Sequence, residues 1–194
     1  MKTLTARDLI NTGVFSAIYF ALTFLFGMLG LFGPAAMPVG AALALIANGV
    51  TIALFQYRVP KIGAMTLLGL IMGLLMTVTG HSWYSIVLAA LLGLAADGIS
   101  YLGSWRRPLL QALSYAVFTC WYIAPVLPLF FNSEAYFTDI AIQMGESYAE
   151  SFRQMLTPTF VIVWQCISFV IALVGGLFGQ SVVRRHFSRA GLTA

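Results

Sequence analysis

The sequence predicts an all-α integral membrane protein, a single domain over residues 1–194 in which six transmembrane helices form a bundle. Three observations lead to this fold class. Hydrophobic residues make up 60% of the chain and charged residues only 8%, whereas soluble domains carry roughly 25% charged residues. The hydrophobic residues form long runs, and the charged residues gather in the breaks between them. Because backbone groups cannot stay unpaired in hydrocarbon, membrane-spanning runs of this kind must be helices.

Six apolar runs reach the length of about 20 residues that a spanning helix needs. They cover residues 10–32, 36–57, 62–80, 83–102, 109–131 and 157–183. The first run follows Lys2 and Arg7, as the apolar core of a secretory signal would. It is longer than such a core and offers no clear small-residue cleavage site, so we expect it to be retained as a helix.

The basic residues indicate how the helices are oriented, because Lys and Arg in short loops mark the cytoplasmic face. Six helices put nine of them on one side: Lys2, Arg7, Arg58, Lys61, Arg106, Arg107, Arg184, Arg185 and Arg189. Only Arg153 falls on the other side, and one helix more or fewer would scatter the nine. We therefore expect both termini to be cytoplasmic, and we interpret the net charge of +4 as a topology signal with no nucleic-acid partner.

The connection over residues 132–156 is the one segment that is neither membrane-spanning nor a tight turn. Apolar residues recur in it near helical spacing: Phe137, Ile140, Ala141, Met144, Tyr148, Phe152 and Met155. We expect one amphipathic helix lying on the extracellular face, between the last two spanning helices. Two roles stay open for it, covering the bundle or closing an outward-facing pocket.

Two kinds of residue inside the runs indicate packing. Small residues four apart let a second helix approach closely, and three such pairs occur: Ala17 with Ala21, Gly69 with Gly73, and Gly175 with Gly179. We expect two of the three to serve packing within the chain. Asp97 is the ionisable residue inside a run, near its cytoplasmic end, and we expect a structural carboxylate there in preference to a proton relay.

Aromatic and polar residues concentrate in the outer half of the predicted bundle. Trp121 and Tyr122 in the fifth helix and Trp164 and Gln165 in the sixth lie at similar depths of about 10–15 Å, given a rise of about 1.5 Å per residue. Other members occupy the outer turns: His81, Trp83 and Tyr84 between the third and fourth helices, and Pro34, Met37 and Pro38 between the first and second. An aromatic pocket with few polar groups is typical of a small-molecule site. For Trp83 and Tyr84 the alternative is an interfacial aromatic belt.

The residue inventory argues against catalysis. The two histidines, His81 and His186, are predicted on opposite faces, and neither a His-Glu-x-x-His motif nor a nucleotide-binding Walker loop occurs. Cys120 and Cys166 each lie inside an apolar run and form neither a disulfide framework nor a metal-ligand pattern. We therefore expect no enzyme, no metal and no cofactor.

Three segments carry a resemblance to a known family: LTARDLINTGVFSAIYF at the start, YIAPVLPLFF followed by MGESYAESFRQML, and GGLFGQSVVRRHFSRAGL at the end. The chain resembles the Trep_Strep or MptS-type family, whose members are regarded as S components, the substrate-binding subunits of energy-coupling factor (ECF) transporters in the bacterial cytoplasmic membrane. The resemblance runs over nearly the whole chain. Its most specific part is the GGLFG helix end with the basic RRHF tail.

This resemblance implies six helices, a transmembrane scaffold subunit and two ATPase subunits as partners, and a vitamin or vitamin precursor as ligand. It implies that an Ala-x-x-x-Ala motif, here Ala17 and Ala21, docks on the scaffold. The connection over residues 33–40, with Pro34, Met37 and Pro38, would cap the pocket, and the whole subunit would topple to deliver its ligand inward.

We interpret the chain as a substrate-capture subunit of a micronutrient importer. Its expected ligand contacts are Trp121, Tyr122, Trp164, Gln165, His81, Trp83 and Tyr84. A neutral, flat or apolar ligand suits the tryptophans, because no basic residue other than Arg153 could reach the pocket. The alternatives are a stand-alone permease, a non-transporting membrane scaffold and an intramembrane enzyme.

Overall fold

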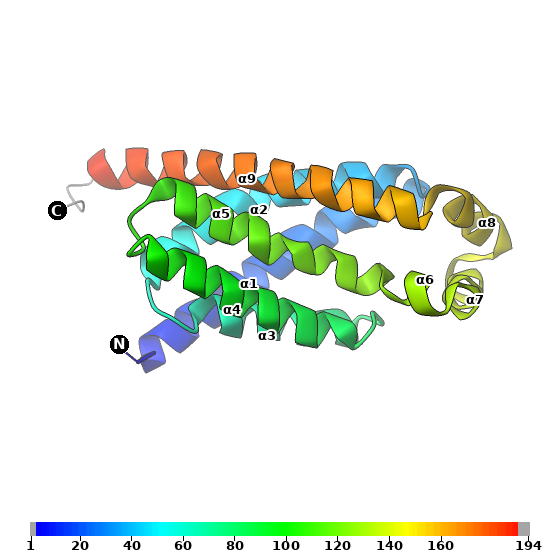
Figure 1. Cartoon of the computed structure of the whole chain (residues 1–194), viewed down its shortest axis with the longest axis horizontal. Helices are drawn as coiled ribbons and strands as arrows, with labels where there is room; N and C mark the ends of the chain where they lie inside the picture. The colour runs from blue at the N-terminus through cyan, green and yellow to red at the C-terminus, as the bar shows by residue number, and fades with distance from the viewer. Residues whose placement is uncertain (1–2, 190–194) are drawn as a thin grey trace.

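The protein is an elongated helical bundle. The computed structural model describes the backbone of residues 3–189 and the side chains of residues 3–186, and no strand occurs in this part of the chain. The long helices lie side by side along the longest axis, and both termini lie at one end, here called the terminal end (Figure 1). The opposite end, here called the distal end, carries the short helices α6 (Pro128–Phe131), α7 (Ser133–Met144) and α8 (Glu146–Met155) (Figure 1).

The helices follow one another with short connections. The elements are α1 (Ala6–Gly27), the 3-10 helix η1 (Met28–Phe32), α2 (Ala36–Arg58), α3 (Ala64–Val78), α4 (Tyr84–Leu102), α5 (Pro108–Thr119), the 3-10 helix η2 (Cys120–Val126), α6 (Pro128–Phe131), α7 (Ser133–Met144), α8 (Glu146–Met155) and α9 (Pro158–Arg189). Successive long helices run in opposite directions along the bundle (Figure 1).

Five helical stretches in the described residues are long and apolar enough to cross a membrane. They are Ala6–Phe32, Ala36–Arg58, Tyr84–Leu102, Pro108–Val126 and Pro158–His186. The run predicted over residues 62–80 forms α3, an apolar helix of 15 residues. At about 1.5 Å per residue it measures about 22 Å, short of the roughly 30 Å hydrocarbon core. The all-α membrane fold is confirmed, and the sixth crossing stays a prediction.

Polarity in α1 is the inverse of that in a soluble helix. Its inward face carries hydroxyl groups and is buried: Thr12, Ser16, Tyr19 and Thr23. Its outward face is apolar, with Val14, Ile18 and Leu25 exposed. Exposed apolar side chains continue along the other long helices, including Leu91 of α4 and Val170 of α9. An apolar surface of this extent, with hydroxyl groups turned inward, fits lipid as the surrounding solvent.

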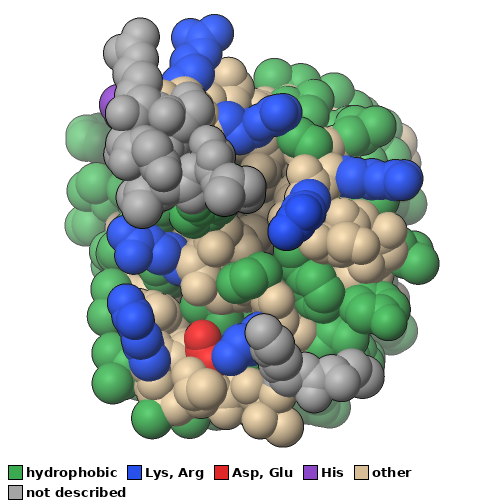
Figure 2. All heavy atoms as spheres, turned by 90° about the vertical axis from the view of Figure 1, so that its left-hand side faces the viewer, with side chains coloured by type: hydrophobic (Ala, Val, Ile, Leu, Met, Phe, Trp, Pro, Cys, Tyr) green, Lys and Arg blue, Asp and Glu red, His purple; other side chains and the backbone are tan. Residues whose placement is uncertain are grey.

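Basic side chains gather at the terminal end of the bundle. Figure 2 shows this end with Lys and Arg spread across it and hydrophobic side chains around its rim. The end of α2 with Arg58, the break after it with Lys61, and the break between α4 and α5 with Arg106 and Arg107 lie here (Figure 1). Lys61 also bonds the Asp8 carboxylate at 2.6 Å and so ties the start of α1 to the break after α2. Lys2 and the side chain of Arg189, also expected on this side, lie outside the described residues.

Glycines set the closest helix contacts. A Cβ added at Gly69 or Gly73 of α3 would collide with the α4 backbone, and one added at Gly49 of α2 would collide with the α9 backbone at Gly175. Gly179 likewise packs on the backbone of Gly49. Two of the three small-residue pairs therefore serve packing within the chain, as expected.

Asp97 of α4 has a structural role, also as expected. Its carboxylate accepts hydrogen bonds from the backbone N–H groups of Gly63, Met65 and Thr66 at 2.9, 3.1 and 3.0 Å, and from the Thr66 hydroxyl at 2.7 Å. These donors form the start of α3, whose first N–H groups have no partner within the helix. The carboxylate thus caps a neighbouring helix and stands at the positive end of its dipole.

Two predictions about the distal half are wrong in detail. The run over residues 109–131 is not one α-helix, because Pro125 and Pro128 cannot donate a backbone hydrogen bond: the chain tightens into η2, which contains Pro125, and Pro128 begins α6. The connection over residues 132–156 forms two amphipathic helices, α7 and α8, in place of one. They separate at Gly145, whose φ of 90° favours glycine.

Candidate functional site

A cluster of aromatic and polar side chains lies inside the bundle where α1, α2 and η2 meet. This central cluster consists of Tyr19, Thr23, Asn48, Trp121 and Tyr122. Trp121 Nε1 donates to Tyr19 Oη at 3.2 Å, and the Thr23 and Tyr122 hydroxyls lie 3.3 Å apart. Asn48 Nδ2 donates to the Tyr19 carbonyl at 3.3 Å and to Thr23 Oγ1 at 3.0 Å. The cluster therefore joins three separate elements through hydrogen bonds.

Local geometry explains how these side chains meet. Tyr19 and Thr23 are four residues apart in α1 and so share one helical face. Trp121 and Tyr122 are consecutive in η2, with ring centroids 4.7 Å apart. Tyr19, Asn48 and Trp121 are almost completely buried. Asn48 lies about 18 Å from the distal end of α2 at about 1.5 Å per residue, close to the middle of a 30 Å hydrocarbon core.

One polar atom of the cluster has no partner. Asn48 Oδ1 is buried and accepts no hydrogen bond. Turning the amide over would place Oδ1 opposite the Tyr19 carbonyl oxygen at about the present Nδ2 distance of 3.3 Å, and two acceptors would then face each other. Leaving a buried acceptor unpaired costs about 1–3 kcal/mol, and no donor in the described chain bonds this oxygen.

A second polar network lies nearer the terminal end and joins α2, α4, α5 and α9. Gln56 Nε2 donates to the Gln111 carbonyl at 3.1 Å and to Ser114 Oγ at 3.3 Å, while Gln180 Nε2 donates to Gln56 Oε1 at 3.0 Å. Ser100 Oγ contacts Gln111 Oε1 and Ser114 Oγ, each at 2.9 Å. All five side chains are uncharged, so the network joins the helices without an intramembrane charge.

Sequence reasoning found Trp121 and Tyr122 but missed Tyr19, Thr23 and Asn48, and it missed the second network entirely. One signal was available. An amide inside an apolar run, such as Asn48 or Gln56, needs a buried hydrogen-bonding partner.

Among the predicted ligand contacts, those on η2 and α9 lie close together. The 3-10 helix η2 packs against α9, and Gln165 Nε2 of α9 is buried without a hydrogen-bond partner. Trp164 precedes it on α9 and is partly buried. The side of η2 that faces α9 is therefore also polar and aromatic.

The predicted contacts between α3 and α4 lie apart, at the distal surface. Trp83 is 59% exposed and lies against Tyr84, with ring centroids 4.3 Å apart. The exposed His81 ring contacts the Thr79 hydroxyl at 3.2 Å. These residues form a surface group, separate from the buried side chains of the central cluster.

The two segments predicted to cover the pocket touch each other. Pro34, Met37 and Pro38 lie at the turn into α2 and in its first residues. Tyr148 Oη of α8 donates to the Gly30 carbonyl of η1 at 3.0 Å and lies 3.7 Å from Met37 Sδ. The α7–α8 segment is thereby attached to the connection between α1 and α2.

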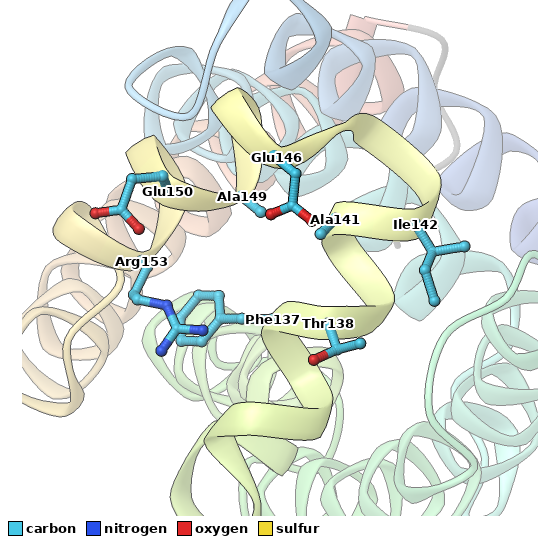
Figure 3. Close-up of a pocket in the computed structure, with 8 residues that line it drawn as sticks. All are labelled: Phe137, Thr138, Ala141, Ile142, Glu146, Ala149, Glu150 and Arg153. Carbon is cyan, nitrogen blue, oxygen red and sulfur yellow. The ribbon is translucent and has the colours of Figure 1, made fainter.

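A small cavity lies between α7 and α8 (Figure 3). Arg153 lies over the Phe137 ring at 4.6 Å (Figure 3) and makes two hydrogen bonds to Glu134, at 3.0 and 3.5 Å. The hydrogen bonds from Arg153 hold the pKa of Glu134 below its ordinary value. The cavity measures about 150 Å³, whereas small-molecule sites usually span about 300–1,000 Å³. It is too small for a vitamin-sized ligand, and the guanidinium that borders it is already paired.

Comparison with known proteins identifies the family. The sequence model of a family described as "Hypothetical bacterial integral membrane protein (Trep_Strep)" matches residues 6–189, from the first residue of α1 to the last of α9. The chain belongs to the Trep_Strep family. The curated proteins and the solved structures gave no match. This match confirms the resemblance to Trep_Strep and the integral membrane class, in agreement with the apolar surface of the bundle.

Proposed function

We propose that this Trep_Strep protein is the substrate-binding (S) subunit of an ECF-type importer in the bacterial cytoplasmic membrane. It captures a vitamin-like small molecule from outside and delivers it inward with a scaffold subunit and two ATPase subunits. In this proposal the chain crosses the membrane six times with both termini inside, and α3 is a short crossing helix paired with α4. The exposed small-residue face of α1 is the observation that carries the proposal.

This face has no neighbour in the described chain that uses its small residues. Ala17 and Ala21 are exposed on α1, and Gly13, one turn earlier, is exposed as well. A Cβ added at Gly13 would meet no atom within 4 Å. The two other small-residue pairs are used inside the bundle, as their collisions with neighbouring backbone show. The exposed small residues of α1 would allow a helix of another subunit to approach its backbone closely, and this supports docking at this face.

The interior supports a small neutral ligand. The central cluster combines flat aromatic rings with hydroxyl and amide groups and contains no ionised side chain. Arg153, the one basic residue predicted on the outer side, is paired with Glu134. A neutral, flat molecule would suit this interior better than a phosphate or a dianion.

Co-purification tests the proposal. The tagged chain would be isolated from membranes of its own bacterium as wild type, as Ala17→Leu/Ala21→Leu, and as the control Ala95→Leu, which changes an exposed alanine of α4. We expect the wild type and the control to bring down a membrane scaffold and ATPase subunits, and the double variant to lose them while staying folded. Equal recovery with the double variant would contradict docking through α1. Substrate uptake by the chain alone in proteoliposomes would replace the proposal with a stand-alone permease.

A further inference from the structure

We infer that Asn48 orients the ligand: its Oδ1 accepts a hydrogen bond from an N–H group of a neutral, planar heterocycle held among Tyr19, Trp121 and Tyr122. This inference rests on the proposed function and names the chemical class of its substrate. A ring with an N–H beside a carbonyl, as in a lactam, a pyrimidinedione or a carboxamide, has this chemistry.

The free acceptor is the first reason. Asn48 is completely buried, both of its Nδ2 hydrogens have partners, and Oδ1 has none. Ser16 and Ser85 also have buried oxygens without partners, but a serine hydroxyl can rotate to bond a carbonyl of its own helix. An amide oxygen only accepts and so requires a donor from elsewhere. A ligand N–H is a donor that would meet this need.

The aromatic surroundings are the second reason. Trp121 lies against Tyr122 at 4.7 Å between centroids, and Tyr19 bonds Trp121 while its own carbonyl fixes the Asn48 amide. Flat rings around one directional acceptor would favour a flat ligand and set its rotation. The absence of ionised groups among these five side chains would disfavour an anionic ligand.

The backbone that carries the aromatic pair is the third reason. Trp121 and Tyr122 lie on η2, a seven-residue 3-10 segment that contains Pro125 and interrupts an otherwise spanning helix. Irregular backbone at membrane depth occurs where it is buried in protein or lines a cavity, and broken helices form substrate sites near the midplane of many transporters. The hydroxyls of Tyr122 and Thr23, 3.3 Å apart, join η2 to α1, and we assign ligand entry to their separation.

Binding of defined probes to the purified chain in nanodiscs tests the inference. The probes are nicotinamide, thymine and hypoxanthine, each compared with its fully N-methylated form, which keeps the ring and loses the N–H donor. We expect at least one parent probe to bind and its methylated form to bind at least about tenfold more weakly, as expected when a buried acceptor is left unpaired. Failure of all three parents to bind, or equal binding of parent and methylated forms, would overturn the inference. This comparison uses only the wild-type chain and so does not depend on the folding of a variant.

Two variants add a second readout. Asn48→Leu removes the acceptor, and Gln56→Leu removes a buried amide from the second network as a matched control. We expect Asn48→Leu to abolish probe discrimination and Gln56→Leu to keep it. If Asn48→Leu still discriminates, the inference fails while scaffold co-purification leaves the proposed function standing. If discrimination depends on Asn48 but no scaffold is recovered with the wild type, the proposed function fails and the site remains.

Discussion

Replacing Asp97 should destabilise the protein strongly, because its carboxylate holds the start of α3. Asp97→Ala leaves three backbone N–H groups and the Thr66 hydroxyl without an acceptor. The Met65 N–H is buried and loses its partner outright, while Gly63 and Thr66 are partly exposed and gain some hydration. At about 1–3 kcal/mol per buried donor and less for hydrated ones, we expect a loss of about 3–5 kcal/mol for the whole cap.

The conservative variant Asp97→Asn should lose only part of this stabilisation. Asp97→Asn can keep an oxygen toward Gly63 and Thr66 and turns its NH₂ toward the Met65 N–H, so about 1–2 kcal/mol should be lost. Reversible unfolding of the protein in mixed micelles with increasing sodium dodecyl sulfate would measure both variants. Asp139→Ala, at an exposed carboxylate of α7, is the control and should change little. A loss below about 1 kcal/mol for Asp97→Ala would refute the capping role that we assign.

Three further predictions concern other contacts. Gly49→Ala should push α2 away from α9 and lower the unfolding midpoint of the protein. Gly13→Ala, in open space on α1, should leave this midpoint unchanged or raise it. Similar decreases in the midpoint for both variants would refute the packing argument. Tyr148→Phe removes the hydrogen bond from α8 to the Gly30 carbonyl of η1, so hydrogen exchange of the α8 amides should accelerate. Unchanged exchange in α8 would contradict this. Because Arg153 lowers the pKa of Glu134, the ion pair should persist at every pH above the ordinary carboxyl pKa near 4.5 and be lost only as the pH falls through the lowered pKa. Loss of the α7 amides' protection from exchange already at pH 6 would contradict this.

The sequence was enough to predict the bundle because the bilayer imposes long apolar runs. The helix starts and ends in the terminal half lie at most six residues from the ends of these runs. The distal half deviates where single residues override the pattern. Pro125 removes a donor and the backbone tightens, and Gly145 adopts a left-handed conformation that splits one amphipathic pattern into two helices.

The candidate site was only partly predictable, for a physical reason. Trp121 and Tyr122 stand out in any apolar run, but which helices face them depends on tertiary packing. Tyr19 and Asn48 join them because α1 and α2 pack beside η2, and hydrogen bonds connect the three elements there. Trp83, predicted in the outer turn as a further ligand contact or as part of an interfacial belt, lies at the exposed distal surface, apart from the cluster.

Native mass spectrometry of the tagged chain, extracted gently from membranes of its own bacterium, tests the central claim most directly. The account predicts one assembly that contains the chain, a second membrane protein and two ATPase subunits, and it predicts that this assembly disappears in Ala17→Leu/Ala21→Leu. Recovery of the wild-type chain only by itself, or only as copies of itself, would contradict the account.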